Sequence, residues 1–196
     1  MTIVADKTAI RAVVLARRAG VPDEIREEFA QRLATIGPSL VRRNGEAPDG
    51  IVSVYHPIRD EVDTVPLFDA LLREGFVTAL PVTVARREPL RFHAWRPGDP
   101  VAPGRWTIPE PLPTAPEVDP DVLFVPLAAF DRRGFRLGYG AGFYDASLNR
   151  LRARKPVLAV GVAYAVQEVE AVPREAHDEP LDAVITERDI IFCGNR

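Results

Sequence analysis

Cysteine and histidine are scarce in this sequence, and long apolar runs are missing. Cys193 is the only cysteine, so no internal disulfide can form, and a reducing compartment, the cytoplasm, is the expected setting. The three histidines, His56, His93 and His177, have no further histidine or cysteine at metal-ligand spacing, which argues against a metal site of that type. No apolar run reaches the length of a membrane-spanning helix, so a membrane partner is not expected.

An excess of charge of one sign is also lacking. The 25 Lys and Arg residues against 28 Asp and Glu give a net charge of −3, which leaves no global field to attract nucleic acid. An anionic ligand must therefore be held by a local cluster of positive groups. Hydrophobic residues at 46% and charged residues at 27% are the mix of a globular protein. The length suits one domain covering residues 1–196, and we expect a monomer.

Proline is concentrated in one segment. Eight of the 19 prolines fall within residues 97–120. Because proline lacks the backbone N–H that a sheet requires and fixes φ, this segment is predicted to be an extended loop wrapped over the surface. A linker between two domains is the alternative, but the flanking segments are too short to build separate cores.

Hydrophobic periodicity predicts an α/β fold with a mostly parallel sheet flanked by helices. Asp6 can cap a first helix that Gly20 ends, and Pro22 opens a second helix whose apolar stripe reaches Ile36. Thr64 can cap a third helix, which separates two β-branched runs and so makes a strand–helix–strand unit. A fourth helix is predicted at residues 143–152. The predicted strands span residues 51–55, 76–80, 122–125, 157–162 and 182–186.

The most informative segment is DRRGFRLGYGAGFYD, which lies between a predicted strand and a predicted helix. The alternating Gly138, Gly140 and Gly142 let backbone N–H groups turn toward a ligand at a helix N-terminus, which suits a phosphate. Arg136 can donate to phosphate oxygens, and Asp145 is a candidate ligand of Mg²⁺. A tight strand-to-helix connection is the alternative, since the pattern is not a Walker A loop.

This segment resembles the signature RLGxGxGxYD of the 5-formyltetrahydrofolate cyclo-ligase family. The similarity covers nearly the whole chain in the same order. Ala141 stands where many members have Gly, and Phe143 where many have Tyr, which puts the role of that hydroxyl in doubt. The other matching positions are Lys7 and Arg11 on the first helix, Tyr55 with Glu61, Asp63 and Thr64, the pair Glu110–Pro111, and VPREAHDEPLDAVIT near the C-terminus.

The resemblance implies a fold similar to that of sugar-phosphate isomerases and CoA-transferases. It also implies an enzyme that converts 5-formyltetrahydrofolate, with or without a polyglutamate tail, to 5,10-methenyltetrahydrofolate. ATP would be the co-substrate and Mg²⁺ the cofactor, with ADP and phosphate released. In that reaction the formyl oxygen is phosphorylated and N10 then attacks the formyl carbon.

The resemblance further implies site residues. Arg136 and Tyr144 would be catalytic, Asp145 would bind the metal, and Tyr55, Glu61, Trp95 and Tyr144 would bind folate. The nucleotide would contact Lys7, Arg11, Arg136, Leu137, Gly138, Tyr139, Gly140, Ala141, Gly142, Phe143, Tyr144 and Asp145.

Plainer interpretations exist for several of these residues. Lys7 and Arg11 could form the solvated face of a helix, Glu61 could belong to an acidic loop before a helix, and Trp95 could be a core residue. Two other functions also stay open: a phosphate-handling isomerase of the same fold, and a non-catalytic relative that binds nucleotide or folate. Absence of ATP hydrolysis coupled to folate would favour the first, and binding without turnover the second.

Overall fold

The computed structural model describes residues 3–45, 49–85 and 88–194. The helices and strands that the sequence predicts are all present, together with shorter elements that it does not predict. The elements in chain order are α1 (Ile3–Ala19), α2 (Asp23–Arg43), β1 (Ile51–Ser53), α3 (Val65–Arg73), β2 (Val77–Val82), β3 (Arg91–Ala94), β4 (Val101–Pro103), the short helix η1 (Arg105–Thr107), β5 (Pro109–Pro111), β6 (Glu117–Val118), β7 (Val122–Pro126), β8 (Ala129–Phe130), β9 (Arg136–Leu137), α4 (Phe143–Arg152), β10 (Leu158–Val162), the short helix η2 (Ala165–Gln167), β11 (Ala183–Ile185) and β12 (Ile190–Phe192).

The centre of the molecule is an eight-stranded sheet in the order β12-β11-β10-β7-β1-β2-β3-β6. Its middle is parallel: β11 pairs with β10, β10 with β7, β7 with β1, and β1 with β2. The outer strands β12, β3 and β6 are antiparallel to their neighbours. The expected α/β fold with a mostly parallel sheet is therefore confirmed.

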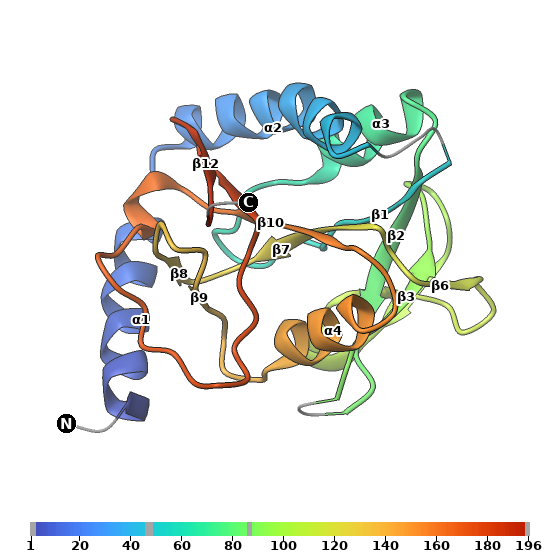
Figure 1. The fold of residues 1–196 in the computed structure, drawn as a ribbon. Coiled ribbons are helices and arrows are strands. Elements are labelled where there is room, and N and C mark those ends of the chain that lie inside the picture. The colour runs from blue at the N-terminus through green and yellow to red at the C-terminus, as the bar shows by residue number, and fades with distance from the viewer. Residues whose placement is uncertain (1–2, 46–48, 86–87, 195–196) are drawn as a thin grey trace.

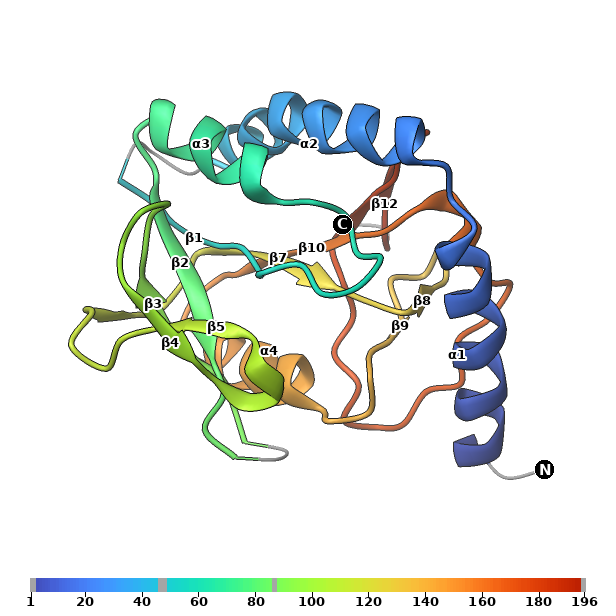
Figure 2. The ribbon, with the colours of Figure 1, turned by 180° about the vertical axis from the view of Figure 1, so that it is seen from behind.

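Helices cover both faces of this sheet (Figures 1 and 2). In β7, Val122 and Phe124 face the core beneath α2 and α3, whereas Leu123 and Val125 face the core beneath α4. All four side chains are fully buried, because parallel strands between two helical layers have no solvent-facing side. Among the described residues, none of the helices combines the length and the apolar character that a membrane crossing requires.

The order of the strands reverses between β1 and β7: the chain continues from β1 to β2 on one side of this pair and from β7 to β10 on the other. The path from β1 to β2 runs through α3 on one face, and the path from β7 to β10 runs through α4 on the other face (Figure 1). Since β1 and β7 are neighbours, the loops that follow them diverge from a shared edge. Ligands of α/β proteins bind at such a point, outside the carboxyl ends of the strands.

The two N-terminal helices differ from the prediction in their limits. The first begins at Ile3, so Asp6 lies in its first turn rather than at its cap. The second continues past Ile36 through Pro38 to Arg43, where burial of Leu40 and Val41 offsets the backbone hydrogen bond lost at proline.

The cap of α3 also differs. The Thr64 side chain makes no cap hydrogen bond, because its hydroxyl donates to the carbonyl of Tyr55 at 2.7 Å. A carboxylate oxygen of Asp63 instead accepts a hydrogen bond from the amide of Val65 at 2.9 Å. Capping therefore comes from the residue before Thr64, and Thr64 ties the start of α3 to the end of the preceding strand segment.

The proline-rich segment is not entirely loop, which corrects the prediction. Strands β4 and β5 pair as a hairpin around η1, and β6 extends the edge of the main sheet. Proline is tolerated here because short edge strands leave N–H positions unpaired. The same segment connects β3 to β7, and both of those strands belong to the eight-stranded sheet.

Candidate active site

The glycine loop, residues 138–142, follows the β8–β9 hairpin at the carboxyl end of β7. Buried Asp131 organises this hairpin by accepting hydrogen bonds from the amides of Arg133, Phe135 and Val172. Gly134 turns the hairpin at φ +90°, and a Cβ there would meet the Leu181 carbonyl oxygen at 2.5 Å. From this hairpin the chain passes through the glycine loop into α4 (Figure 1).

The glycine loop has the geometry of an anion-binding backbone. Gly140 and Gly142 have φ of +93° and +72°, while Ala141 keeps a φ that any residue adopts. Within the described chain, the amides of residues 138–142 donate to no backbone carbonyl. Arg11 of α1 fixes the loop from below, since its Nε donates to the Gly138 carbonyl at 2.9 Å. Unpaired amides before α4 therefore lie close to the Arg11 guanidinium, and both kinds of group can bind an anion.

Buried Arg136 and half-buried Asp145 form an ion pair across the two ends of the glycine loop. The Arg136 guanidinium donates to Oδ1 of Asp145 at 2.7 Å, and its side chain is 4% exposed. It also donates to the Glu179 carbonyl, while the Glu179 amide donates to Asp145 at 3.1 Å. Burial lowers the pKa of Arg136 from its ordinary value, and the charges of Asp145 and Asp178 oppose that effect.

Lys7 has partners other than the glycine loop in this conformation. Its ammonium group lies 3.0 Å from Oε2 of Glu175 and 3.1 Å from Oδ2 of Asp178. Burial alone would lower the pKa of Lys7, but the hydrogen bonds to Glu175 and Asp178 raise it above its ordinary value. Lys7 and Arg11 lie one turn apart on α1, and both are engaged rather than solvated.

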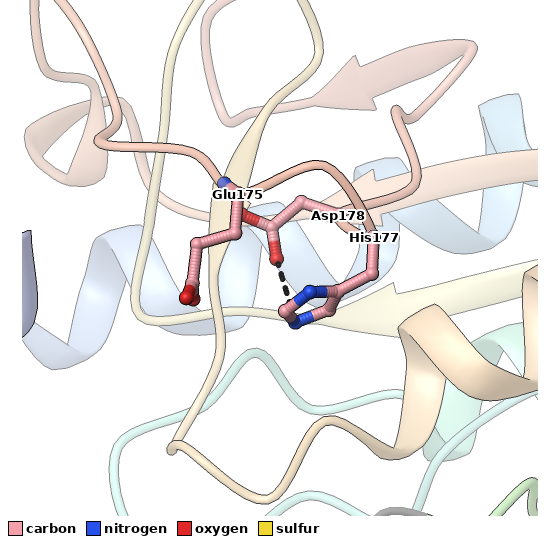
Figure 3. A group of neighbouring side chains, drawn as sticks. All are labelled: Glu175, His177 and Asp178. Atoms are coloured by element: carbon pink, nitrogen blue, oxygen red, sulfur yellow. Dashed lines mark hydrogen bonds and ion pairs between the residues drawn. The ribbon is translucent and has the colours of Figure 1, made fainter.

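A small group of possible metal ligands lies on the loop beside Lys7. Figure 3 shows Glu175, His177 and Asp178, whose ligand atoms lie within 4.8 Å of one another. The His177 ring is 3.8 Å from the Asp178 carboxylate and is mostly exposed. The sequence analysis considered only histidine and cysteine as partners of a histidine ligand. It therefore did not identify this group, in which the partners of His177 are two carboxylates.

Glu61 meets the glycine loop across the reversal point of the sheet. It lies in the segment after β1, where the Ile58 amide donates to its Oε2 at 3.0 Å. The Tyr139 hydroxyl donates to its Oε1 at 2.7 Å and accepts a hydrogen bond from Arg18 at 2.8 Å. Burial raises the pKa of Glu61, and the two donors together with the Arg18 charge oppose this rise.

Two further tyrosines lie near Glu61. Burial first and the Glu61 charge second raise the pKa of Tyr144 far above its ordinary value, so this phenol stays protonated at neutral pH. Burial and Glu61 raise the pKa of Tyr55 in the same way. Tyr55 is 2% exposed, and its hydroxyl donates to the Val62 carbonyl at 3.3 Å, so it supports the Glu61 segment from beneath.

Trp95 lies away from these residues. Its amide donates to the Thr78 carbonyl, near the amino end of β2, whereas Glu61 and the glycine loop follow carboxyl ends of parallel strands. The ring packs edge-on against Phe68, with centroids 5.3 Å apart. Trp95 packs against the core that also contains Tyr55, and within the described residues it makes no hydrogen bond to Glu61 or the glycine loop. Its predicted contact with folate stays a prediction.

A cavity of ≈ 730 Å³ opens beside Glu61. It lies between the start of α2 and the start of α3, and its wall includes Arg26, Arg59 and Tyr164. The Tyr164 hydroxyl is buried and has no hydrogen-bond partner within the described chain. The cavity is large enough for a drug-sized ligand whose polar edge reaches Glu61.

Arg18 is the residue of this site that the sequence interpretation missed. It is 2% exposed and reaches Tyr139. A signal was present, because Lys7, Arg11 and Arg18 follow one another at spacings of four and seven and therefore share one face of α1. An arginine inside an amphipathic helix is usually solvated, so the spacing alone did not single it out.

Known proteins resemble this chain over most of its length. Residues 3–187 match the model of the 5-formyltetrahydrofolate cyclo-ligase family. The 5-formyltetrahydrofolate cyclo-ligase of Mycolicibacterium smegmatis is 35% identical, covering 92% of this chain and 93% of that protein. The Escherichia coli enzyme of the same name is 36% identical over 87% of this chain and 93% of its own length.

A solved structure agrees with these relatives. The NMR structure of Aquifex aeolicus 5,10-methenyltetrahydrofolate synthetase superposes with a TM-score of 0.74 and is 33% identical, covering 97% of this chain and 94% of that one. The family match, the identity to both bacterial enzymes and the shared fold extend over nearly all of the same residues. This chain belongs to the 5-formyltetrahydrofolate cyclo-ligase family.

Proposed function

We propose that this chain uses ATP to close 5-formyltetrahydrofolate into 5,10-methenyltetrahydrofolate, releasing ADP and phosphate. One observation carries the proposal beyond family membership. The glycine loop, suited to phosphate, and Glu61, suited to a pterin ring, meet at one point and share the Tyr139 hydroxyl. A reaction that phosphorylates a folate oxygen needs both ligands side by side.

The chemical difficulty lies in the leaving group. The N5-formyl group is an amide, and N10 is a weak nucleophile, so direct ring closure would have to expel oxide. Transfer of the terminal phosphoryl group of ATP to the formyl oxygen breaks the bond to ADP. N10 then attacks the formyl carbon and loses its proton, and the oxygen departs as phosphate. Phosphoryl transfer demands position and charge neutralisation above all.

The glycine loop and the residues around it would position the phosphates of ATP and neutralise their charge. The amides of residues 138–142 would bind phosphate oxygens, and Arg136 would neutralise the charge that develops on the transferred group. Arg11 would hold the loop through Gly138. Glu175 and Asp178 hold the Lys7 ammonium in this conformation. When ATP binds, Lys7 would leave these carboxylates and pair with a phosphate. Tyr144, a protonated phenol, would donate to the formyl oxygen or its phosphate.

The residues present fit a magnesium ion. Arg136 and the Glu179 amide both bond to Oδ1 of Asp145, and Oδ2 has no hydrogen-bond partner within the described chain. Asp145 is the carboxylate that pairs with Arg136, and the more distant charge of Asp178 also acts on that guanidinium. Mg²⁺ takes few carboxylates and completes its shell with water and phosphate oxygen. Asp145 would hold the ion, which would neutralise charge on the ATP phosphates.

Folate would bind on the Glu61 side. The carboxylate would accept hydrogen bonds from pterin N–H groups, with Tyr144 beside the formyl group. The ≈ 730 Å³ cavity at Glu61 supports this placement, since it offers room for the ring system. Tyr55 would act by supporting the Glu61 segment. The position of Trp95 near the amino end of β2 gives its predicted contact with folate no support.

The proposal extends to the oligomeric state, the compartment and the partners of the chain. We infer a monomer in the cytoplasm that takes folate with or without a polyglutamate tail and has no nucleic-acid partner. Cys193 is buried, and burial raises the pKa of its thiol to about 11, so it takes no part in the chemistry. Light scattering of the purified chain, with and without ligands, tests the monomer directly.

An absorbance assay tests the proposed activity. Purified chain, 5-formyltetrahydrofolate, ATP and Mg²⁺ are expected to give the near-ultraviolet band of the methenyl product. Arg136→Ala is expected to abolish it, because the buried guanidinium beside the glycine loop is lost. Arg132→Ala is the matched control: Arg132 lies four residues earlier, is exposed and pairs with Glu168 on the surface. No product from folded wild-type chain, or equal rates for the two variants, would contradict the proposal.

A further inference from the structure

Arg18 is a buried cation without a direct counterion. It is 2% exposed, and no carboxylate of the described residues lies within ion-pair distance of its guanidinium. Its Nε is buried and has no hydrogen-bond partner among the described groups. Burying a guanidinium costs free energy unless the group is paired, so another contact must stabilise the Arg18 charge.

That contact is the Tyr139 hydroxyl, which connects Arg18 to Glu61. Arg18 donates to the hydroxyl at 2.8 Å, and the hydroxyl donates to Oε1 of Glu61 at 2.7 Å. The direction is fixed, because a guanidinium only donates, a carboxylate only accepts, and a phenol has one proton. The Arg18 guanidinium also lies 6.0 Å from the centre of the Tyr139 ring. The three residues therefore form an ion pair with a phenol between its charges.

This arrangement, the Arg18–Tyr139–Glu61 bridge, joins three separate parts of the chain. Arg18 comes from α1, Tyr139 from the glycine loop, and Glu61 from the segment after β1. It thus crosses the point where the connections of the sheet diverge. Tyr139 presents its backbone to the phosphate-binding loop and its hydroxyl to the carboxylate assigned to folate.

We propose that Arg18 and Tyr139 are positioning residues for Glu61: Arg18, acting through the Tyr139 hydroxyl, holds the folate-binding carboxylate ionised and oriented. The inference rests on the proposed function, since it concerns the site assigned to folate. Tyr139 then has two separable roles. Its backbone serves the nucleotide, and its hydroxyl serves the folate. A phenol at this position of the loop is a determinant of folate affinity in this chain.

Tyr139→Phe separates the two roles, because it removes the hydroxyl and keeps both the ring and the backbone. Tyr139 is 38% exposed, so the substitution leaves the core untouched. We expect the KM for 5-formyltetrahydrofolate to rise about tenfold, the effect of losing one hydrogen bond to a charged group. The KM for ATP and kcat are expected to change little. If the hydroxyl merely held the loop in place, the KM for ATP would rise with it.

Arg18 is tested by two substitutions. Arg18→Met removes the charge, and it is expected to raise the folate KM at least as much as Tyr139→Phe does. Arg18→Lys keeps a donor and a charge, and it is expected to restore part of the loss. Arg17→Met is the matched control, since Arg17 is the preceding residue on α1 and is exposed. The double variant Arg18→Met, Tyr139→Phe is expected to lose less than the product of the two single losses.

Thermal melting of each variant establishes that it is folded. If the wild-type chain forms no methenyl product, the proposed function fails. If the wild-type chain is active but Tyr139→Phe leaves the folate KM unchanged, or raises both KM values together, the bridge has no positioning role and this inference alone is overturned. A rise confined to folate, shared by Arg18→Met and absent from Arg17→Met, establishes it.

Discussion

At the scale of single residues, the site is defined by groups whose surroundings set their protonation. Burial raises the pKa of Glu61 and of Tyr144, with opposite consequences. The raised value brings protonation of Glu61 closer to neutral pH, whereas it moves ionisation of Tyr144 further away. One residue is therefore sensitive to acid, and the other keeps its proton in alkaline solution.

Folate binding is predicted to weaken on the acid side. A carboxylate accepts two N–H groups and a carboxylic acid does not, so affinity is present above the raised pKa of Glu61 and is lost as the pH falls through it. Glu61→Gln is expected to raise the folate KM and to flatten this acid limb, with the KM for ATP little changed. Steady-state kinetics over a range of pH checks this. An acid limb that persists in the glutamine variant would assign it to another group.

Tyr144 is predicted to act on the rate. Because its phenol stays protonated, it can donate to the oxygen that is phosphorylated, and Tyr144→Phe is expected to lower kcat about a hundredfold, as for other positioned donors. The ring remains, so the folate KM should move far less. Single-turnover measurements separate the chemical step from product release. A normal single-turnover rate in the phenylalanine variant would remove Tyr144 from the chemistry.

At the scale of elements, the glycine loop depends on left-handed backbone at chosen positions. Gly140 has φ +93° and no neighbour nearer than the Arg11 guanidinium at 4.0 Å from a built Cβ, so a side chain there meets strain but no obstacle. Gly138 has an ordinary φ and open space around it. The two glycines therefore allow backbone conformation to be tested apart from steric fit.

Gly140→Ala is predicted to weaken ATP binding more than Gly138→Ala does. An L-residue in the left-handed region costs about 1–2 kcal/mol. Relief of that strain would turn the loop amides away from the phosphates, so the KM for ATP is expected to rise about tenfold. Titration with a non-hydrolysable ATP analogue measures the affinities. Equal losses for the two variants would indicate that φ at Gly140 is unimportant for the nucleotide.

At the scale of the whole molecule, the order of strands places the site. The strand–helix–strand unit and the buried run at residues 122–125 could be recognised from periodicity, and both lie in the parallel centre of the sheet. The pairing of β1 with β7 could not be, because it depends on contacts between segments about 70 residues apart. That pairing is what brings Glu61 to the glycine loop.

The side-chain partners were less predictable than the elements. The glycine spacing pointed to the loop, and Arg136 and Asp145 pair across it. The pairing of Lys7 with Glu175 and Asp178 crosses nearly the whole chain, and no local pattern indicates it. The folate contact of Trp95 stays a prediction, because strand register, which sequence alone leaves open, places its amide against Thr78 near the amino end of β2.

The coupling of ATP to ring closure is the measurement that tests the central claim most directly. Methenyl product, ADP and phosphate are quantified together, with and without 5-formyltetrahydrofolate. The account predicts equal amounts of all three with folate and negligible ADP without it, because the glycine loop and Glu61 form one site. Product formed without ATP consumption, or ATP hydrolysis that folate does not affect, would contradict it.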